Sequence, residues 1–509
     1  MGRMMGAVTL VQLPPELLCL ILALLDAHDL VRVRKTCRAL KALVDNSEML
    51  QYIIDLRYFQ MVLVRTSETD VPWSTRRKRL RQHDVAWQRL EYKQRCTLPS
   101  VMLGHTHELL GGIYGSAGED CIYFARLPSA CDSNYLHCWS HPFDTTISMD
   151  FTFSAAQDLL VVVAFPPDAA TNPEGTRYII DREEVQPISH SNVHIIGNYI
   201  CILLWNITVN GVTGAGMQMW DWKSEKGYQF ILLFINGIND CSFIAEDRFL
   251  ILDTCGTMEL YSFADKSKPP QCTAKLSLPS LLVNFSYTEA FTSDNITPGS
   301  VLPYPRKSYQ PSCSFHPSMN DQLIAIHISV AGETNADDLH LYNFFTLRSA
   351  ILELEGLFAR TYGQPTFDGP NLLWSTWGPQ HTTWFRVRRN EDWHSGLCGF
   401  HVVESISYDT SDSARESGRL RIRDFNPHIA RNYDAQDKSD CRGVLVQGEL
   451  TTTIYRPFTE PLGSALPYRE IVSEELFDAD SGILMDESRI LLLKRDGTAG
   501  HQNIDVLVF

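Results

Sequence analysis

The densest apolar stretch of the chain lies near its N-terminus, where nine consecutive apolar residues run from Leu17 to Leu25. Leu13-Pro14-Pro15-Glu16 comes directly before this run. Proline is tolerated in the first turn of a helix, and an acidic side chain there stabilises the positive end of the helix dipole. The pattern therefore predicts a helix from Pro15 to Leu25. Because its apolar residues face every side, this helix needs to be covered on every side.

Two shorter amphipathic segments follow this helix, at 30–37 and at 40–44, and both have the spacing of helix faces. A module of about 40 residues is too small to surround an all-apolar helix by itself. Burying one Leu side chain contributes roughly 1.5–3 kcal/mol, so exposed leucines are costly. The sequence therefore predicts that a second protein covers the exposed side of the helix.

The next segments are predicted to be helical as well. Leu50 to Arg65 is largely apolar and continues the module, and a polar break with Pro72 follows. A second helix is predicted over 74–93, with Ser74 as its N-cap. This helix carries a basic run, 76–81, which fits either a solvated helix face or a nuclear localisation signal.

From about Leu98 the pattern changes to short strand-like runs separated by Gly, Asp, Asn and Pro. Runs that are apolar on both faces, such as 324–326 and 490–493, predict central strands. Two short connections, 253–257 and 447–449, predict hairpins. The predicted strands are 159–165, 199–205, 217–222, 230–235, 248–253, 258–263, 323–330, 340–345, 371–375, 382–387, 444–447, 451–455, 489–493 and 505–509.

Some 400 residues of short paired strands require an architecture that hides sheet edges, and radial blades do so. We expect an α+β multidomain protein whose large all-β part is a β-propeller of about six to eight blades. Tandem β-sandwiches are the alternative. The expected divisions are a flexible N-terminus at 1–11, a helical module at 12–50, a helical linker at 51–97 and the β-rich domain at 98–509.

The N-terminal pattern resembles an F-box. The resemblance rests on Leu13-Pro14-Pro15-Glu16, Ile21, Leu24-Leu25, Asp29-Leu30, Val33, Cys37-Arg38 and the 40–44 segment, and it covers about 12–50. In that family the module docks substrate receptors on a Skp-type adaptor of cullin–RING ubiquitin ligases. The bulky Trp often found near the end of the module is absent, and Met49-Leu50 stand there. This departure implies either weaker adaptor contact or a shift of that contact to Leu50 and Tyr52.

The rest of the chain is similar to the long F-box proteins of mushroom-forming fungi. The similarity rests on 50–56, on Ala86-Trp87-Gln88-Arg89-Leu90 after the basic helix, and on Met219-Trp220-Asp221-Trp222. Those proteins join the F-box to a β-rich, often propeller-like, C-terminal half. The resemblance implies a role and no particular target.

The resemblance implies a non-catalytic substrate receptor of an SCF-type ligase. Its partners would be a Skp-type adaptor, through it a cullin, and an unknown target protein held on the β domain. A propeller scaffold whose F-box serves an assembly outside ubiquitin ligation is the first alternative, and an enzyme with an appended F-box is the second. The residues expected to form or support the adaptor-binding surface are Leu13, Pro14, Leu17, Ile21, Leu24, Leu25, Leu30 and Val33.

Composition narrows the partners and the compartment. Residues 1–100 hold 16 Lys and Arg against 10 Asp and Glu, so their net charge is +6. The rest of the chain therefore carries a net charge of −22, since the whole chain has −16. An acidic C-terminal part disfavours nucleic acid as a ligand. Thirteen Cys without a leader-like pattern fit reduced thiols in the cytoplasm or the nucleus. The apolar run of nine is shorter than the roughly 20 residues that span a bilayer, so no membrane partner is expected.

No motif for nucleotide binding or hydrolase chemistry stands out, and no cofactor is expected. The best metal candidate is the set Cys131, His137, Cys138 and His141, since zinc prefers Cys and His ligands. The six residues between the two cysteines do not match a usual zinc spacing, so no metal site is assigned.

Overall fold

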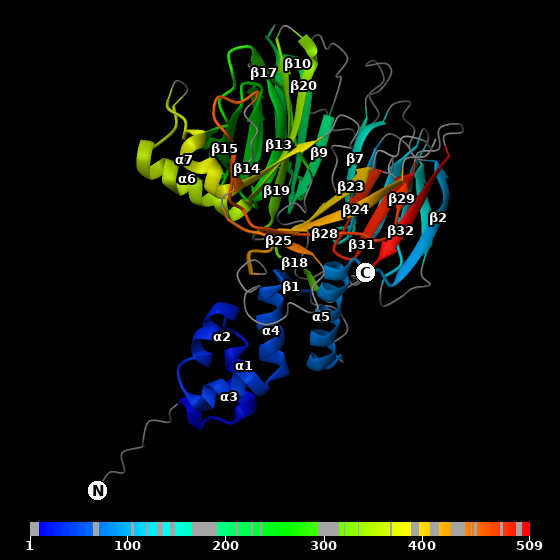
Figure 1. Ribbon diagram of the computed structural model, residues 1–509, viewed down its shortest axis with the longest axis vertical. Helices are drawn as coiled ribbons and strands as arrows, with labels where there is room; N and C mark the ends of the chain where they lie inside the picture. The colour runs from blue at the N-terminus through cyan, green and yellow to red at the C-terminus, as the bar shows by residue number, and fades with distance from the viewer. Residues whose placement is uncertain are drawn as a thin grey trace.

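The protein combines a small helical module with a large ring of β-sheets (Figure 1). The module lies at one end, away from the sheets, and the C-terminus lies beside the helix that joins the two parts. The computed structural model describes residues 10–64, 71–102, 106–118, 121–129, 136–142, 148–164, 191–209, 212–224, 227–234, 237–293, 315–319, 321–333, 335–366, 369–387, 396–407, 417–428, 443–448, 450–451, 456–478, 482–494 and 501–509.

Four short helices build the module around one core. Helix α1 ends three residues earlier than predicted, because the backbone N–H groups of Leu24 and Leu25 bond three residues back, to Ile21 and Leu22, and tighten the last turn. Asp26 caps the next helix by accepting the backbone N–H of Asp29 at 2.8 Å. The elements are a 3₁₀ turn η1 (Leu10–Gln12), α1 (Pro15–Leu22), α2 (Ala27–Arg34), α3 (Arg38–Asn46) and α4 (Glu48–Tyr58).

The connection to the sheets differs from the predicted pair of helices. Helix α4 ends at Tyr58, and β1 (Met61–Leu63) follows it and pairs with β18 (Phe315–Pro317). The predicted helix to Arg65 is therefore too long. Helix α5 (Trp73–Arg89) then runs toward the sheets, and Pro72 rather than Ser74 occupies its N-cap position. Strand pairing through β1 thus fastens the module to a segment about 250 residues later in the chain.

Six sheets of four or more strands give the described part of the chain a six-bladed β-propeller arrangement. The prediction of a propeller is confirmed over tandem β-sandwiches. All pairings within the blades are antiparallel, and most join consecutive strands; the exceptions are β17 with β19, β24 with β28 and β29, β25 with β28, and β2 with β32. The first three blades in chain order are β3 (His107–Leu110), β4 (Ile113–Ala117), β5 (Cys121–Arg126) and β6 (His137–Pro142); β9 (Ser191–Ile196), β10 (Tyr199–Val209), β11 (Val212–Asp221) and β12 (Gln229–Phe234); and β13 (Ile238–Ala245), β14 (Arg248–Asp253), β15 (Thr257–Ser262) and β16 (Gln271–Ser277).

The remaining blades include the one that closes the ring. There, β2 pairs with β32, so the first and the last strand of the propeller share one sheet. These blades are β17 (Phe285–Ser293), β19 (Leu323–Gly332), β20 (Asn335–Leu347) and β21 (Thr382–Val387); β22 (Gly396–Cys398), β23 (His401–Ser407), β24 (Ser417–Asp424), β28 (Tyr468–Val472) and β25 (Val444–Val446), with β29 (Phe477–Asp478) beside β24; and β2 (Gln94–Met102), β32 (His501–Val508), β31 (Arg489–Lys494) and β30 (Gly482–Met485). Two further pairs are β7 (Ser148–Ser154) with β8 (Leu159–Ala164), and β26 (Leu450–Thr451) with β27 (Gly463–Ser464).

The predicted central strands lie in the middle of their blades. Strand β19 runs between β17 and β20, and β31 runs between β30 and β32. Ile324, Ile326, Ile490 and Leu492 are all buried, as two-sided apolar strands require. The Asp253–Thr257 connection joins β14 to β15 as predicted, with Gly256 at a positive φ of 83°.

One strand prediction and one hairpin prediction are wrong. The segment 371–375 enters helix α7 (Trp374–His381), where Trp374 and Trp377 lie three residues apart and pack on the sheet together. Gln447–Glu449 does not close a hairpin, because β25 pairs with β28 and β26 pairs with β27. Helix α6 (Arg348–Tyr362) precedes α7, and both lie beside the β13–β16 and β17–β21 blades (Figure 1). None of the helices in the described ranges has both the length and the apolar character needed to span a bilayer.

Candidate functional site

Helix α1 has one face in the module core and one face in solvent. Leu18 and Leu22 are buried on the inner face. On the outer face, the exposed fractions are 48% for Leu17, 60% for Leu20, 41% for Ile21 and 86% for Leu24. We call these four residues the apolar stripe. The chain itself covers only the inner face, as the small size of the module predicts.

The apolar stripe includes three of the predicted surface residues and one that the sequence analysis missed, Leu20. The four residues follow the spacing i, i+3, i+4 and i+7, which is the spacing of one helix face. This period was the available signal for Leu20, but it is hidden when every position of the helix is apolar. Leu10, on the preceding 3₁₀ turn, is 48% exposed and was missed as well.

The other predicted residues lie at different depths. Pro14 is exposed and Leu13 is half-buried at the start of α1. Leu25 and Val33 are half-buried against the module core. Leu30 is fully buried in that core, so among the residues expected to form or support the surface it can only support it from beneath.

Adaptor contact through Leu50 and Tyr52 is corrected. Leu50 belongs to the module core together with Leu22, Leu30 and Val44. Tyr52 packs between the module and the propeller, in a cluster with Leu80 and Phe315. Both side chains are fully buried, so neither offers surface to another protein.

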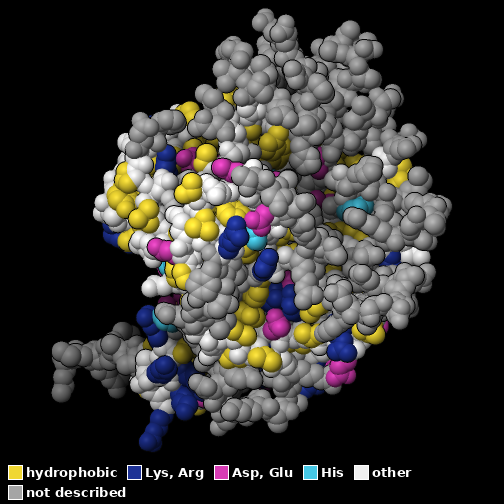
Figure 2. Space-filling model, turned by 45° about the horizontal axis from the view of Figure 1, so that its top comes forward, with side chains coloured by type: hydrophobic (Ala, Val, Ile, Leu, Met, Phe, Trp, Pro, Cys, Tyr) yellow, Lys and Arg dark blue, Asp and Glu magenta, His cyan; other side chains and the backbone are white. Residues whose placement is uncertain are grey.

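The module also carries exposed basic side chains. Figure 2 shows Lys and Arg gathered at the lower left of the molecule, where the module lies in Figure 1. Helices α2 and α3 and the turn between them carry five exposed basic residues, with no acidic residue between position 30 and position 44. The exposed basic residues of this surface are Arg32, Arg34, Lys35, Arg38 and Lys41.

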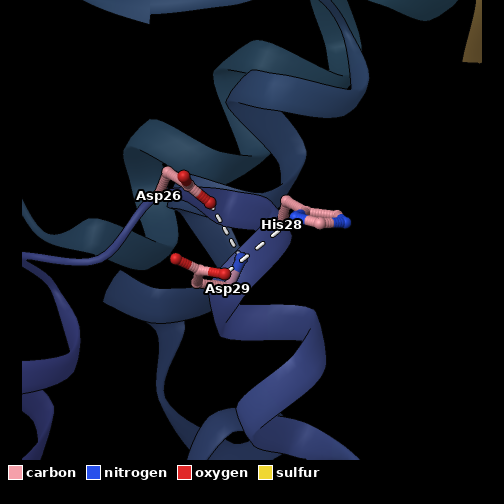
Figure 3. A group of neighbouring side chains, drawn as sticks. All are labelled: Asp26, His28 and Asp29. Carbon is pink, nitrogen blue, oxygen red and sulfur yellow. Dashed lines mark hydrogen bonds and ion pairs between the residues drawn. The ribbon is translucent and has the colours of Figure 1, made fainter.

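Asp26, His28 and Asp29 are the one group with metal-ligand spacing among the described residues, and they lie at the start of α2 (Figure 3). Their contacts have a structural purpose. Asp26 accepts the backbone N–H of Asp29, and Asp29 pairs with Arg32 at 3.3 Å. Both carboxylates therefore stabilise the start of the helix, and we assign no metal to them.

The zinc candidates are not brought together as a set. His137, Cys138 and His141 lie on strand β6, where neighbours point to opposite faces. The His137 ring stacks with Trp139, and the His141 ring contacts Phe124 edge-on. Cys131 lies outside the described residues.

The basic run of α5 forms ion pairs with helix α4. Arg77 Nε lies 2.8 Å and Arg81 Nε lies 2.7 Å from Oδ2 of the buried Asp55. Arg77 also pairs with Glu48 at 3.2 Å. Two arginines of the run therefore bind α5 to the module. The prediction of a solvated helix face does not hold for these two residues.

Helix α5 meets the propeller at a pocket lined by the turns β22–β23 and β30–β31. The Trp87 ring stacks on Phe509 with ring centres 4.2 Å apart and on His401 at 5.3 Å. Trp87 Nε1 donates to the backbone oxygen of Glu487 at 3.3 Å, and His83 Nε2 lies 2.6 Å from the same oxygen. We call this contact region the joint.

Burial shifts the pKa values of two titratable groups in the joint. Burial lowers the pKa of His83 to about 4. Burial, and then the nearby Asp424 carboxylate, raises the pKa of Asp84 to about 8. Both side chains are therefore uncharged near neutral pH, which suits a buried contact between two parts of one protein.

Three comparisons with known proteins bear on these observations. The F-box domain family matches residues 10–52, and no curated protein matches the chain. The WD40 domain of SCAP from fission yeast is 8% identical, with 79% of this chain and 81% of that chain covered and a TM-score of 0.33. The β-propeller domain of Cps50 (Swd1) from Myceliophteria thermophila is 10% identical, with 82% and 100% covered and a TM-score of 0.36.

The domain match begins at the residue where the described structure begins and ends inside helix α4, so it covers η1 and helices α1 to α3 in full. The apolar stripe lies entirely within it. The architecture of the rest follows from the strand pairing described above. Residues 10–52 are therefore an F-box domain, and the chain carries it in front of a six-bladed β-propeller.

Proposed function

We propose that this protein is the substrate receptor of an SCF-type cullin–RING ubiquitin ligase. The apolar stripe of α1 docks on a Skp-type adaptor, which connects it to a cullin, and the propeller holds a target protein. The observation that carries the proposal is the exposure of the stripe within a matched F-box domain. The receptor supplies no reacting group, because ubiquitin transfer is catalysed by proximity once target and conjugating enzyme are held together.

Docking through the stripe is energetically reasonable. The exposed fractions of its four side chains add up to more than two complete side chains. Covering them contributes on the order of 5 kcal/mol, at roughly 1.5–3 kcal/mol for each full Leu. The basic residues of α2 and α3 favour an adaptor whose apolar contact surface has an acidic rim.

Copurification with a Skp-type adaptor and its cullin tests this function. The double variant Leu20→Asp with Leu24→Asp places charge on two exposed positions, so the fold is retained while adaptor recovery falls at least about 100-fold. Val283→Asp is the matched control, since Val283 is 93% exposed on the propeller. Equal adaptor recovery from both variants contradicts the proposal. Adaptor recovery without cullin favours the scaffold over the ligase receptor.

The finer assignments are proposals that accompany this function. We place the protein among the long F-box proteins of mushroom-forming fungi, on the sequence similarities named above. It acts in the cytoplasm or the nucleus. The domain limits follow the sequence pattern, with the F-box at 12–50, the linker at 51–97 and the propeller at 98–509; in the structure, strand β2 begins at Gln94.

A further inference from the structure

A lysine side chain occupies a box of three aromatic rings between two blades. Lys266 follows strand β15, and its ammonium nitrogen lies 3.9 Å from the ring centre of Phe263. The same nitrogen lies 4.4 Å from the ring centre of Tyr199 and 5.0 Å from that of Tyr228. Tyr199 and Tyr228 belong to the β9–β12 blade, and Phe263 belongs to the β13–β16 blade. We call the three rings the aromatic box.

The rings have the arrangement that holds a cation. The planes of Tyr228 and Phe263 are within 14° of parallel, with centres 6.2 Å apart. The ammonium nitrogen lies 5.0 Å and 3.9 Å from these two centres, so the two rings do not enclose it from opposite sides. The Tyr199 ring stands at 86° to Tyr228 and 84° to Phe263, so the three rings form an open corner beside the nitrogen. The face of an aromatic ring carries negative charge density, which attracts a cation held above it.

Carboxylates add to this attraction. Asp247 and Asp221 act on the Lys266 ammonium and Asp265 acts on Tyr228, so three acids lie near the aromatic box. Burial nevertheless lowers the pKa of Lys266, because its strongly hydrated ammonium loses water on entering the box. The Tyr228 hydroxyl is buried and has no hydrogen-bond partner among the described residues. The box therefore attracts positive charge but fits a hydrated ammonium imperfectly.

The Lys266 side chain can leave the aromatic box without unfolding of the turn that carries it. Lys266 lies on an exposed turn whose backbone is held by its neighbours. Asp265 Oδ1 accepts from the N–H of Ser267 at 3.1 Å, and the carboxylate pairs with Lys268 at 3.3 Å. None of these contacts involves the Lys266 side chain, so rotation about its own bonds is enough to open the box.

We propose that the aromatic box is a binding site for an alkylated ammonium group and that Lys266 is its built-in competitor. Alkylation spreads the charge and weakens hydration, so an alkylated cation enters the box with less loss of water than the Lys266 ammonium. It also offers methyl groups that contact all three rings. The group belongs either to an alkylated lysine of a protein or to a free quaternary amine. The proposal goes beyond the ligase function and does not depend on adaptor docking.

Titration of the full-length chain with tetramethylammonium chloride tests the site, with binding read from the line width of the methyl protons of the probe and sodium chloride as the ionic control. Removing the competitor in Lys266→Ala tightens binding about tenfold. Lys268→Ala, on the same turn but away from the rings, and Lys266→Arg both bind as the wild type does. Adding Tyr228→Leu to Lys266→Ala removes the gain, and circular dichroism verifies that each variant is folded.

Two results overturn the proposal. One is that Lys266→Ala binds tetramethylammonium no better than the wild type. The other is that the gain persists when Tyr228 is replaced, which places the probe elsewhere. A second titration of Lys266→Ala, with a short trimethyl-lysine peptide, separates the two sources: at least tenfold tighter binding than tetramethylammonium assigns a protein ligand, and equal binding assigns a free quaternary amine.

Discussion

Replacing Trp87 by alanine probes the joint between helix α5 and the propeller. Trp87 is buried, and its ring is stacked between Phe509 and His401. Removing a buried Trp side chain costs about 3–5 kcal/mol when the surrounding structure collapses only partly. The carbonyl of Glu487 keeps its contact with His83 at 2.6 Å, so no acceptor is left without a partner. We therefore expect the lower part of that range, about 3–4 kcal/mol.

Urea unfolding measures the expected loss. Trp73→Ala is the matched control, because Trp73 begins the same helix but is more than one-third exposed. Its contacts are the Tyr52 ring at 5.9 Å and the Arg76 guanidinium at 4.8 Å. We expect a loss of about 1 kcal/mol for this control. A loss for Trp87→Ala that is no larger than the loss for Trp73→Ala refutes the reasoning about the joint.

The same variant has a functional consequence under the proposed role. The apolar stripe lies on α1 and makes no contact with Trp87, so adaptor binding is retained in Trp87→Ala. Target ubiquitination slows, because a loose joint no longer fixes the distance between adaptor and target. Reconstituted transfer assays report the rate, and adaptor affinity serves as the internal reference.

Three further predictions concern stability. In the pH range from about 4 to about 8, the raised pKa of Asp84 keeps its carboxyl protonated in the folded state, whereas the unfolded chain releases the proton, so the wild type loses stability as the pH rises. Asp84→Asn removes this loss, so the variant becomes increasingly more stable than the wild type across the range. A constant difference in the free energy of urea unfolding contradicts the assignment. Asp26→Ala removes the cap of α2 and lowers the free energy of unfolding by about 1 kcal/mol, measured by the same method, whereas Asp26→Ser retains most of it. Gly256→Ala lowers the melting temperature, because φ is +83° and the new Cβ would lie 2.5 Å from Tyr287; an unchanged melting temperature shows that the turn adapts.

Much of the β architecture could be predicted because its strongest strands are apolar on both faces. The runs 324–326 and 490–493 show no helical period, and both proved to be central strands. Helix α7 was missed because it holds two Trp, which usually favour strands, together with Gly378 and Pro379, which disfavour helices. This segment is helical because the helix buries Trp374 and Trp377 together against the sheet. Such tertiary contacts cannot be read from the local sequence.

The F-box could be located from its pattern, but its surface could not. An all-apolar helix gives no sign of which face is inner, so Leu20 on the exposed face of α1 was missed. The ion pairs of the α5 arginines could not be predicted from the sequence either. Arg77 and Arg81 pair with Asp55, which lies 22 and 26 residues earlier, and no local rule connects residues so far apart.

The pairing of β2 with β32 has a consequence for biosynthesis. The last blade of the ring cannot form until β32 has emerged from the ribosome, roughly 400 residues after β2. At about 5–20 residues per second, that delay is about 20 to 80 seconds. The F-box emerges first and can fold during this interval, whereas the joint waits for Phe509. A nascent chain can therefore present its adaptor-docking surface well before it is able to hold a target.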